Sequence, residues 1–450
     1  MATFEKIMIA NRGEIARRII RTCRKMGIKT VAVYSEADLE APYVEEADEA
    51  VCIGPAQAKK SYLDIEKIIQ AARESEADAI HPGYGFLSEN PQLVRRCEEE
   101  NIVFIGPDAL QIERMGSKIE ARLHMKQAGV PVVPGWDGKL DRVEDALSIA
   151  EQVGYPIMLK ASAGGGGIGM QLIHSEADLR KSFASTMQRA SSSFGDGTLF
   201  IEKWIENPHH IEVQVACDAY GNAVHLFERE CSVQRRNQKI IEETPSPFLD
   251  PLTKKRLLET ALAGVKHIGY KNVGTMEFIM DEHKNFYFLE MNTRLQVEHP
   301  ITEETTGIDL VELQIRLAEG EKLPFVQSDI QQTGHSIECR LYAEDPKTFF
   351  PSPGTIQELH LPDQDVRLDF AVKQGTKVSP FYDPMIGKII THASTRELAI
   401  EKMKDCLKQV EVHGITTNLL LLEQVMGDRG FIEGNYTTRL VESVWDEGGS

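Results

Sequence analysis

The first third of the chain alternates short apolar runs with segments whose apolar residues recur at helical spacing. Residues 6–10 form one such run, and residues 13–26 then carry Ile15, Ile19 and Cys23 on one helical face, with Gly27 where a helix end favours a left-handed residue. Further strands are predicted at residues 30–34, 50–53, 79–81 and 102–105, with helices near 62–76 and 90–100. This alternation predicts a doubly wound parallel α/β domain that binds ligands at the carboxyl ends of its strands.

A second unit begins near residue 131. Its pattern gives a strand at 156–160 that leads into a glycine-rich loop, a helix at 176–191 and a strand at 198–203. From about residue 205 the chain shows mixed strands with helices at 251–267 and 308–319. After residue 334 short strands and turns dominate, and helices are predicted near 395–410 and 417–427. The fold class is therefore mixed, α/β followed by α+β.

Length and composition limit the function classes. With 450 residues, 42% hydrophobic and 26% charged, the chain is an ordinary globular sequence of roughly three domains at about 150 residues each. A formal net charge of −19 argues against a nucleic-acid partner, so any anion site needs its own lysines and arginines. Seven scattered cysteines without a C-x-x-C pair favour a reducing compartment, and we expect a cytoplasmic protein that does not cross a membrane.

The glycine-rich loop follows a predicted apolar strand that ends at Lys160. Its sequence is Lys160-Ala-Ser-Ala-Gly-Gly-Gly-Gly-Ile-Gly169. Consecutive glycines let backbone N–H groups approach phosphate oxygens, and a lysine at the strand end adds a positive charge. The alternative is a flexible linker. The Gly-Lys-Ser/Thr of a Walker A loop is missing, and a G-x-G-x-x-G dinucleotide motif does not follow the first strand.

A run of polar residues between 290 and 298 predicts a second site. In Glu290-Met-Asn-Thr-Arg-Leu-Gln-Val-Glu298, an extended chain would place the even-numbered side chains on one face and Met291, Leu295 and Val297 on the other. Glu277 lies on an upstream strand that could pair with this one as a hairpin. Glu277, Glu290 and Asn292 offer the oxygen ligands that suit Mg²⁺, whereas the plainer alternative is a solvated sheet face with ion pairs.

Eight motifs in order make the chain resemble biotin carboxylase, a member of the ATP-grasp superfamily, over nearly its whole length. They are Ile9-Ala-Asn-Arg-Gly-Glu-Ile-Ala16, His81-Pro-Gly-Tyr-Gly-Phe-Leu-Ser-Glu-Asn90, Met115-Gly-Ser-Lys118, the glycine-rich loop, Glu290-Met-Asn-Thr-Arg-Leu-Gln-Val-Glu-His-Pro300, Arg340-Leu-Tyr-Ala-Glu-Asp345, Phe350-Pro-Ser-Pro-Gly354 and Tyr382-Asp-Pro-Met-Ile-Gly387. The resemblance implies an ATP-grasp fold with an N-terminal α/β domain at 1–114, a linker helix at 115–131, a mobile lid at 132–204, a central domain at 205–330 and a C-terminal domain at 331–446.

The resemblance also implies roles for individual residues. ATP would be bound by a set that matches the family's nucleotide positions: Lys118, Lys160, Gly165, Gly166, Glu202, Lys203, Ile205, His210, Gln234 and Asn237. Mg²⁺ or Mn²⁺ would be held by Glu277, Glu290 and Asn292. Bicarbonate would lie among Lys239, Arg294, Gln296 and Val297, with Glu298 as the general base. Arg340 would stabilise the biotin enolate, and Tyr84 and Asp383 would lie near the biotin pocket.

Two positions depart from the family pattern. Ile168 stands where the loop usually carries arginine, and Asn237 stands where an imidazole is usual. Neither departure removes a metal ligand or the base.

The expected partners are a biotin carboxyl carrier protein, a carboxyltransferase and a second copy of the chain, since no Ala-Met-Lys-Met biotin-attachment sequence is present. The acceptor implied first is acetyl-CoA; another acyl-CoA, pyruvate or urea stays open. Another carboxylate-activating ATP-grasp ligase and a non-catalytic nucleotide-binding subunit are the alternative functions.

Overall fold

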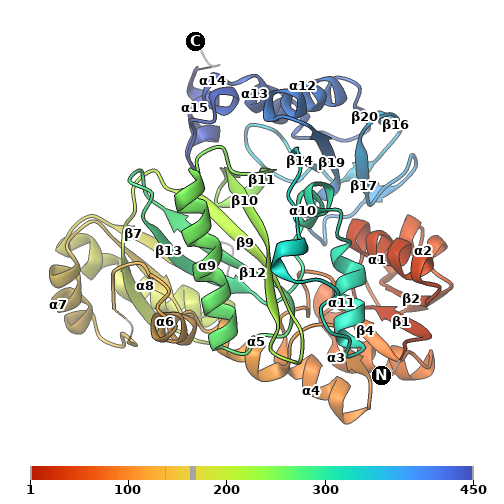
Figure 1. The fold of residues 1–450 in the computed structure, drawn as a ribbon, viewed down its shortest axis with the longest axis horizontal. Helices are drawn as coiled ribbons and strands as arrows, with labels where there is room; N and C mark the ends of the chain where they lie inside the picture. The colour runs from red at the N-terminus through yellow and green to blue at the C-terminus, as the bar shows by residue number, and fades with distance from the viewer. Residues whose placement is uncertain (1–2, 137, 163–168, 448–450) are drawn as a thin grey trace.

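The N-terminal unit is built on a parallel sheet covered on both faces. The computed structural model describes residues 3–136, 138–162 and 169–447. Five strands lie in the order β3-β2-β1-β4-β5 and all neighbours are parallel (Figure 1). Ile7 and Ile9 of β1 pack into one core and Met8 into another on the opposite face, as the period of two along a strand requires. The predicted doubly wound domain is confirmed.

The bounds of these elements lie close to the expected ones. The strands are β1 (Lys6–Ile9), β2 (Lys29–Tyr34), β3 (Glu49–Cys52), β4 (Ala79–His81) and β5 (Val103–Phe104). The helices are α1 (Gly13–Met26), α2 (Pro42–Glu46), α3 (Ile65–Glu74), α4 (Pro91–Glu99), α5 (Ala109–Gly116) and α6 (Lys118–Gln127), with single 3₁₀ turns η1 (Glu36–Asp38) and η2 (Ala58–Lys60).

A small antiparallel sheet carries the second unit. Its strands β6 (Ile157–Ala161), β7 (Met170–Ile173) and β8 (Leu199–Lys203) lie in the order β7-β6-β8. Helices α7 (Val143–Val153) and α8 (Glu176–Phe194) pack on it around Ile149, Leu159 and Leu179, and Figure 1 shows this unit projecting beside α9. The Lys160 end of β6 and the start of β7 therefore flank the glycine-rich loop.

One antiparallel sheet runs through the remainder of the chain. Its eight strands lie in the order β13-β12-β9-β10-β11-β14-β19-β17. Their bounds are β9 (His209–Cys217), β10 (Ala223–Arg235), β11 (Gln238–Thr244), β12 (Asn272–Met280), β13 (Phe286–Asn292), β14 (His335–Tyr342), β17 (Arg367–Phe370) and β19 (Met385–Ala393). Because β11 pairs with β14, the proposed central and C-terminal domains share one sheet across residue 330.

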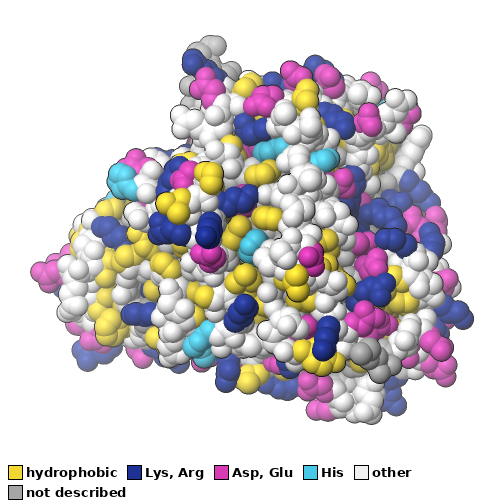
Figure 2. Space-filling model, in the orientation of Figure 1, with side chains coloured by type: hydrophobic (Ala, Val, Ile, Leu, Met, Phe, Trp, Pro, Cys, Tyr) yellow, Lys and Arg dark blue, Asp and Glu magenta, His cyan; other side chains and the backbone are white. Residues whose placement is uncertain are grey.

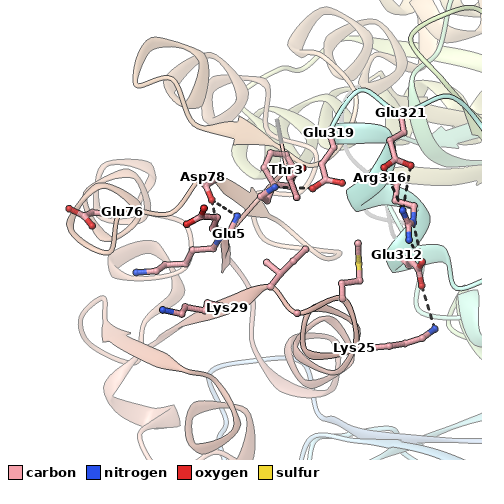
Figure 3. A pocket seen from close by; sticks show the side chains of 15 residues that line it. Thr3, Glu5, Lys25, Lys29, Glu76, Asp78, Glu312, Arg316, Glu319 and Glu321 are labelled. Carbon is pink, nitrogen blue, oxygen red and sulfur yellow. Dashed lines mark hydrogen bonds and ion pairs between the residues drawn. The ribbon is translucent and has the colours of Figure 1, made fainter. Parts of the chain in front are cut away.

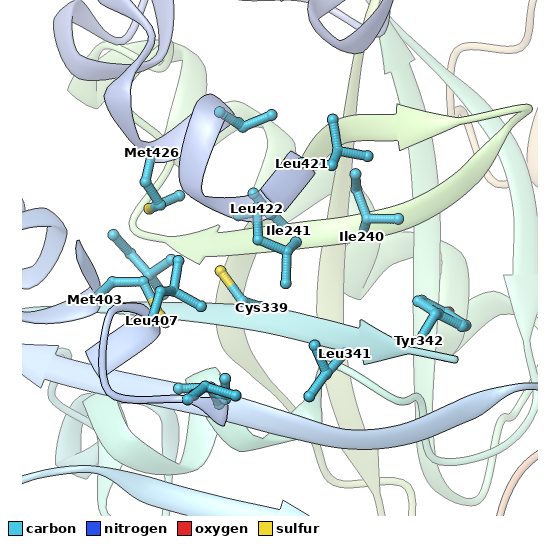
Figure 4. Packing of buried hydrophobic residues seen from close by; sticks show 14 of the residues in the cluster. Ile240, Ile241, Cys339, Leu341, Tyr342, Met403, Leu407, Leu421, Leu422 and Met426 are labelled. Carbon is cyan, nitrogen blue, oxygen red and sulfur yellow. The ribbon is translucent and has the colours of Figure 1, made fainter. Parts of the chain in front are cut away.

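Helices cover this sheet and short strands edge it. The helices are α9 (Pro251–His267), α10 (His299–Thr306), α11 (Leu310–Ala318), α12 (Arg396–Leu407), α13 (Leu419–Gly427), α14 (Arg429–Glu433) and α15 (Leu440–Glu447), with the 3₁₀ turn η3 (Gln327–Asp329). Two small ladders pair β15 (Gly354–Thr355) with β18 (Lys377–Val378) and β16 (Glu358–His360) with β20 (Glu411–His413). Figure 4 shows Met403, Leu407, Leu422 and Met426 of α12 and α13 packed over Ile241 and Cys339.

The surface and the cysteines add two observations. Basic and acidic side chains lie interspersed over the face shown in Figure 2. All seven cysteines are free thiols, and six of them are buried. None of the helices within the described residues combines the length and the hydrophobicity that a membrane span requires.

Candidate active site

A cavity of about 350 Å³ lies between the small sheet and the large one. It brings together seventeen of the predicted site residues from eight separate segments: Lys118, Lys160, Glu202, Lys203, Ile205, His210, Gln234, Asn237, Lys239, Glu277, Glu290, Asn292, Arg294, Gln296, Val297, Glu298 and Arg340. Tyr84 and Asp383 do not line it. Gly165, Gly166 and Ile168 lie outside the described residues.

The predicted hairpin of Glu277 and Glu290 is present. Strands β12 and β13 pair antiparallel with Glu277 opposite Glu290, and the register shifts by one residue between Glu277 and Phe278. Leu289 is the extra residue of this bulge, since Phe288 is opposite Phe278. The bulge turns Glu290 to the cavity side although Phe288, two residues earlier, faces the core.

The prediction of one extended strand over residues 290–298 is wrong beyond Asn292. Strand β13 ends there, and the chain turns through Thr293 to Val297 into α10, which starts at His299 with Pro300 in its first turn. The Thr293 N–H, which would continue the ladder, donates instead to Glu89 Oε1 at 3.1 Å. Val297 consequently lines the cavity rather than the core. Gln296 and Glu298 still reach the cavity, because the turn folds back over Glu277.

Lys239 is the centre of the charged floor. Its Nζ lies 2.5 Å from Glu212, 2.9 Å from Glu277 and 2.7 Å from Glu298. Burial alone would lower the pKa of Lys239, but these three carboxylates raise it well above its usual range. Lys239 is therefore a permanent positive charge at the floor of the cavity.

Glu298 is held between two cations. Its second oxygen is 2.9 Å from Arg340 Nη2, and Arg340 also pairs with Glu242. Burial would raise the pKa of Glu298, yet Lys239, Arg340 and Arg229 together lower it well below its usual range. A carboxylate that stays ionised and faces a cavity can accept a proton from a ligand.

The three predicted metal ligands lie side by side on the hairpin. Glu290 pairs with Lys118 at 2.8 Å, and Asn292 Nδ2 donates to Glu277 Oε1 at 2.8 Å. His210 Nε2 lies 2.8 Å from Glu277 Oε2, while Gln234 donates to His210 Nδ1 at 2.8 Å, which fixes the histidine tautomer. Two carboxylates and one amide oxygen on neighbouring strands are hard donors and fit Mg²⁺.

Apolar side chains from both sheets form a further part of the cavity, its apolar wall, and such a lining can bind a flat aromatic ring. Met158, Met170, Ile279 and Leu289 line it together with Ile205. Lys203 Nζ donates to the Gly154 and Tyr155 carbonyl oxygens at 2.8 and 3.2 Å, so its ammonium group is bound to the segment before β6. Glu202 pairs with Lys160, the strand residue that precedes the glycine-rich loop.

Asn237 occupies a position that suits asparagine. Arg236 and Asn237 join β10 to β11 with φ values of 49° and 63°. A two-residue hairpin turn with positive φ at both positions favours asparagine. The departure from imidazole is therefore compatible with the local backbone.

Several site residues escaped the sequence analysis. Glu212 could have been found, because His210, Glu212 and Gln214 alternate with Ile211 and Val213 along β9. Arg229, which lies 2.6 Å from Glu212 and donates to Gln296 at 2.7 Å, gives no such signal, since its neighbours in β10 are also polar or buried.

A second hollow, of about 830 Å³, lies between the N-terminal sheet and α11. Its charged groups pair with one another: Arg316 lies 2.8 Å from Glu312 and 3.5 Å from Glu321, and the Phe4 N–H donates to Glu319 at 2.9 Å (Figure 3). Of these contacts, the Phe4–Glu319 hydrogen bond joins the segment before β1 to the residue that follows α11.

Family models match almost the whole chain. They are the N-terminal domain of biotin carboxylase at residues 3–112, the ATP-binding domain of the carbamoyl-phosphate synthase L chain at 117–326 and the C-terminal domain of biotin carboxylase at 338–443. Biotin carboxylase 2 of Bacillus subtilis is 59% identical over 97% of this chain and 98% of its own length. The chain belongs to the biotin carboxylase family.

Other members of this family are parts of longer proteins or have known ligands. The human mitochondrial propionyl-CoA carboxylase alpha chain is 50% identical over 99% of this chain, which spans 62% of its length. The biotin carboxylase domain dimer of the Hydrogenobacter thermophilus 2-oxoglutarate carboxylase, solved with MgADP, ADP and bicarbonate, superposes with a TM-score of 0.96. It is 48% identical and each chain is covered to 98%, so the ATP-grasp fold is the fold of this protein.

Proposed function

We propose that this biotin carboxylase uses ATP and bicarbonate to carboxylate biotin borne on a carrier protein, the first half-reaction of a biotin-dependent carboxylase. The observation that carries the proposal is Glu298, an ionised carboxylate fixed 2.7 Å from Lys239 and 2.9 Å from Arg340, in a cavity that is also lined by Lys118 and Lys160.

The nucleotide would lie across the cavity from ring to phosphates. The apolar wall of Met158, Ile279 and Leu289 would take the adenine, and Lys118 and Lys160 would exchange Glu290 and Glu202 for phosphate oxygens. Mg²⁺ or Mn²⁺ held by Glu277, Glu290 and Asn292 would neutralise charge on the phosphates.

Bicarbonate would lie between Lys239, Arg294 and Gln296, and Glu298 would take its proton. A bicarbonate oxygen then attacks the γ-phosphorus while the bond to the bridging oxygen of ADP breaks, which yields carboxyphosphate and ADP. Carboxyphosphate breaks down to CO₂ and phosphate in the enclosed cavity.

The second step involves the biotin end of the site. Phosphate would take the ureido proton, Arg340 would stabilise the enolate, and the enolate nitrogen would attack CO₂. Tyr84, which donates to Glu14, lies within the electrostatic reach of both Arg340 and Asp383, and we propose that Tyr84 and Asp383 border biotin.

The acceptor and the partners complete the proposal. We propose acetyl-CoA as the acceptor of the whole system, with another acyl-CoA, pyruvate or urea as the alternatives, and a carrier protein, a carboxyltransferase and a second copy of this chain as partners in the cytoplasm. The alternative functions have less support: another carboxylate-activating ligase has no need of Arg340 beside Glu298, and a non-catalytic subunit has no need of an ionised base.

The test is ADP release by the purified chain with ATP, Mg²⁺ and bicarbonate, with and without free biotin. We expect bicarbonate-dependent release that free biotin stimulates, with labelled bicarbonate incorporated into biotin. ADP release that depends on bicarbonate but ignores biotin would favour another ligase, and no release at all would favour a nucleotide-binding subunit.

A further inference from the structure

Glu242 is a fully buried carboxyl group that lies beside Arg340, where α10 packs across β11 and β14 (Figure 1). It contacts Arg340 Nη2, the same nitrogen that donates to Glu298 Oε2 at 2.9 Å. Its second oxygen has no hydrogen-bond partner among the described residues. Glu242 is also not among the described residues that line the cavity proposed for ATP. Burying a carboxyl oxygen without a donor is costly, so this one calls for a functional reason.

The two carboxylates that share Lys239 with Glu298 differ from Glu242 in this respect. They are Glu212 and Glu277, and Lys239 Nζ contacts both of them as well as Glu298. Glu212 accepts a hydrogen bond on each of its oxygens, at 2.6 and 2.5 Å. Glu277 does the same, at 2.9 and 2.8 Å. A proton on either group would displace one of these donors, whereas Glu242 can take a proton on its free oxygen.

The charges around the pair also favour a proton on Glu242 rather than on Glu298. Burial would raise the pKa of Glu298, but Lys239 and Arg340 lower it well below its usual range. Burial raises the pKa of Glu242 to about 7, although the charge of Arg340 opposes the shift. Among the described residues, the charged and titratable groups that face Glu242 are Arg340 and Glu338 on β14, Glu298 at the start of α10, Lys239 on β11 itself and Cys231 on β10. Burial raises the pKa of Glu338 well above its usual range, so Glu338 stays protonated and adds no charge.

We propose that Glu242 accepts the proton that Glu298 takes from bicarbonate, and so returns Glu298 to its ionised form within each turnover. The inference rests on the proposed function, in which the ureido proton leaves with phosphate and the bicarbonate proton stays on Glu298. The O–H bond of protonated Glu298 breaks and an O–H bond forms on Glu242, between two carboxyl groups that contact one nitrogen of Arg340. Glu242 gives the proton to water at the end of the turnover. Once it is neutral, Glu242 no longer competes for Arg340, whose charge is then available to the enolate.

The variant Glu242→Gln keeps the shape of the side chain but cannot take a proton. At about pH 8 we expect kcat of bicarbonate-dependent ADP release to fall about tenfold or more, while KM for ATP and for bicarbonate stays within about twofold. At constant bicarbonate concentration the wild-type rate should fall as the pH is lowered through about 7, because Glu242 is then protonated before bicarbonate binds. In Glu242→Gln this fall should be lost. A lower rate that still falls near pH 7 would indicate a structural role and overturn the assignment.

Glu338→Gln is the matched control, because Glu338 is the register partner of Glu242, equally buried, and neither of its oxygens has a hydrogen-bond partner among the described residues. It should keep the rate within about twofold and keep the fall near pH 7. Thermal melts and calorimetric titration with MgATP verify the folding of both variants. An unchanged rate in Glu242→Gln, an equal loss in Glu338→Gln, or a wild-type rate that does not change near pH 7 overturns the proton acceptor. A wild-type chain without bicarbonate-dependent ADP release overturns the proposed function instead.

Discussion

Glu298→Gln removes the proposed base and keeps its shape. An amide oxygen can still accept from Lys239 or Arg340, but the side chain no longer takes a proton. Lys239 retains Glu212 at 2.5 Å and Glu277 at 2.9 Å, and Arg340 retains the carboxyl group of Glu242, so neither cation is left without a partner. We therefore expect the free energy of unfolding to decrease by only about 1–3 kcal/mol, which is the contribution of a hydrogen bond to a charged group.

The catalytic loss should be far larger. A positioned general base contributes about 10²–10⁴ in rate, so bicarbonate-dependent ADP release should fall by that factor. MgATP binding should change less than about threefold, because the apolar wall, Lys118 and Lys160 are untouched. A fixed-time assay of ADP release measures the rate, and calorimetric titration with nucleotide measures the MgATP affinity of the same preparation.

Glu243→Gln is the matched control. Glu243 follows Glu242 on β11, so its side chain lies on the opposite face of the sheet. It is buried like Glu298 and pairs with His335 and Arg396 at 2.6 and 2.7 Å. It should lose stability without losing the bicarbonate-dependent rate per folded molecule. A Glu298→Gln variant that retains more than a tenth of wild-type turnover would refute the assignment of the base.

Three further perturbations test other parts of the site. Arg340→Gln should keep slow bicarbonate-dependent ADP release but lose its stimulation by free biotin. Because Arg340 and Lys239 together lower the pKa of buried Glu298, the acid limb of the pH–rate profile of this variant should move to higher pH. ADP release measured over a pH series checks this shift. Burial raises the pKa of Glu242 from its ordinary value of 4.5 to about 7, although the charge of Arg340 opposes the shift. Between these two pH values the folded state keeps a proton that the unfolded state releases, so wild-type stability should fall by about 3 kcal/mol from pH 4.5 to pH 7 through this group. Urea unfolding at both pH values should show a smaller difference in Glu242→Gln, and an unchanged difference would contradict this assignment. Lys388→Met should lower the free energy of unfolding by about 3–5 kcal/mol, measured in urea, because it leaves the buried Glu14 carboxylate unpaired. Fully buried Lys388 lies 3.2 Å from Glu14 and donates to the Val297 carbonyl oxygen at 2.7 Å. A decrease below about 1 kcal/mol would show that Glu14 is protonated in the variant.

The sequence predicts the elements whose signals are local. The strand at Ala79–His81 and the helix at 251–267 have the expected bounds, since apolar period, Pro251 and the Asp250 cap all lie within the segment. Gly27 has φ 76° and closes α1, as its position after Met26 indicates. The eight-stranded sheet was not predicted as one unit, because the pairing of β11 with β14 joins residues almost a hundred positions apart.

The error at residues 293–298 has a distant cause. Period two persists through Glu298, so the sequence favours a strand, but the Thr293 N–H is taken by Glu89 of the N-terminal unit. Glu89 also binds Arg294 Nε at 2.8 Å, which aims that guanidinium along the cavity. Likewise, strict alternation would put Phe288 and Glu290 on one face, and only the bulge at Leu289 separates them. Neither feature has a signal inside its own segment.

The position of Glu298 would allow it to act as the proposed base although its pKa is lowered. Glu298 is the N-cap residue of α10, yet its side chain caps no N–H of that helix and points to Lys239 and Arg340 instead. The helix N-terminus adds to the two cations in keeping the carboxylate ionised before substrate arrives. A bicarbonate anion at the proposed site beside Lys239 would share that lysine with Glu298 and weaken the attraction that depresses the pKa of Glu298. On the proposed mechanism the carboxylate would therefore become a stronger base only when bicarbonate is bound, and proton transfer would be coupled to occupancy of the site.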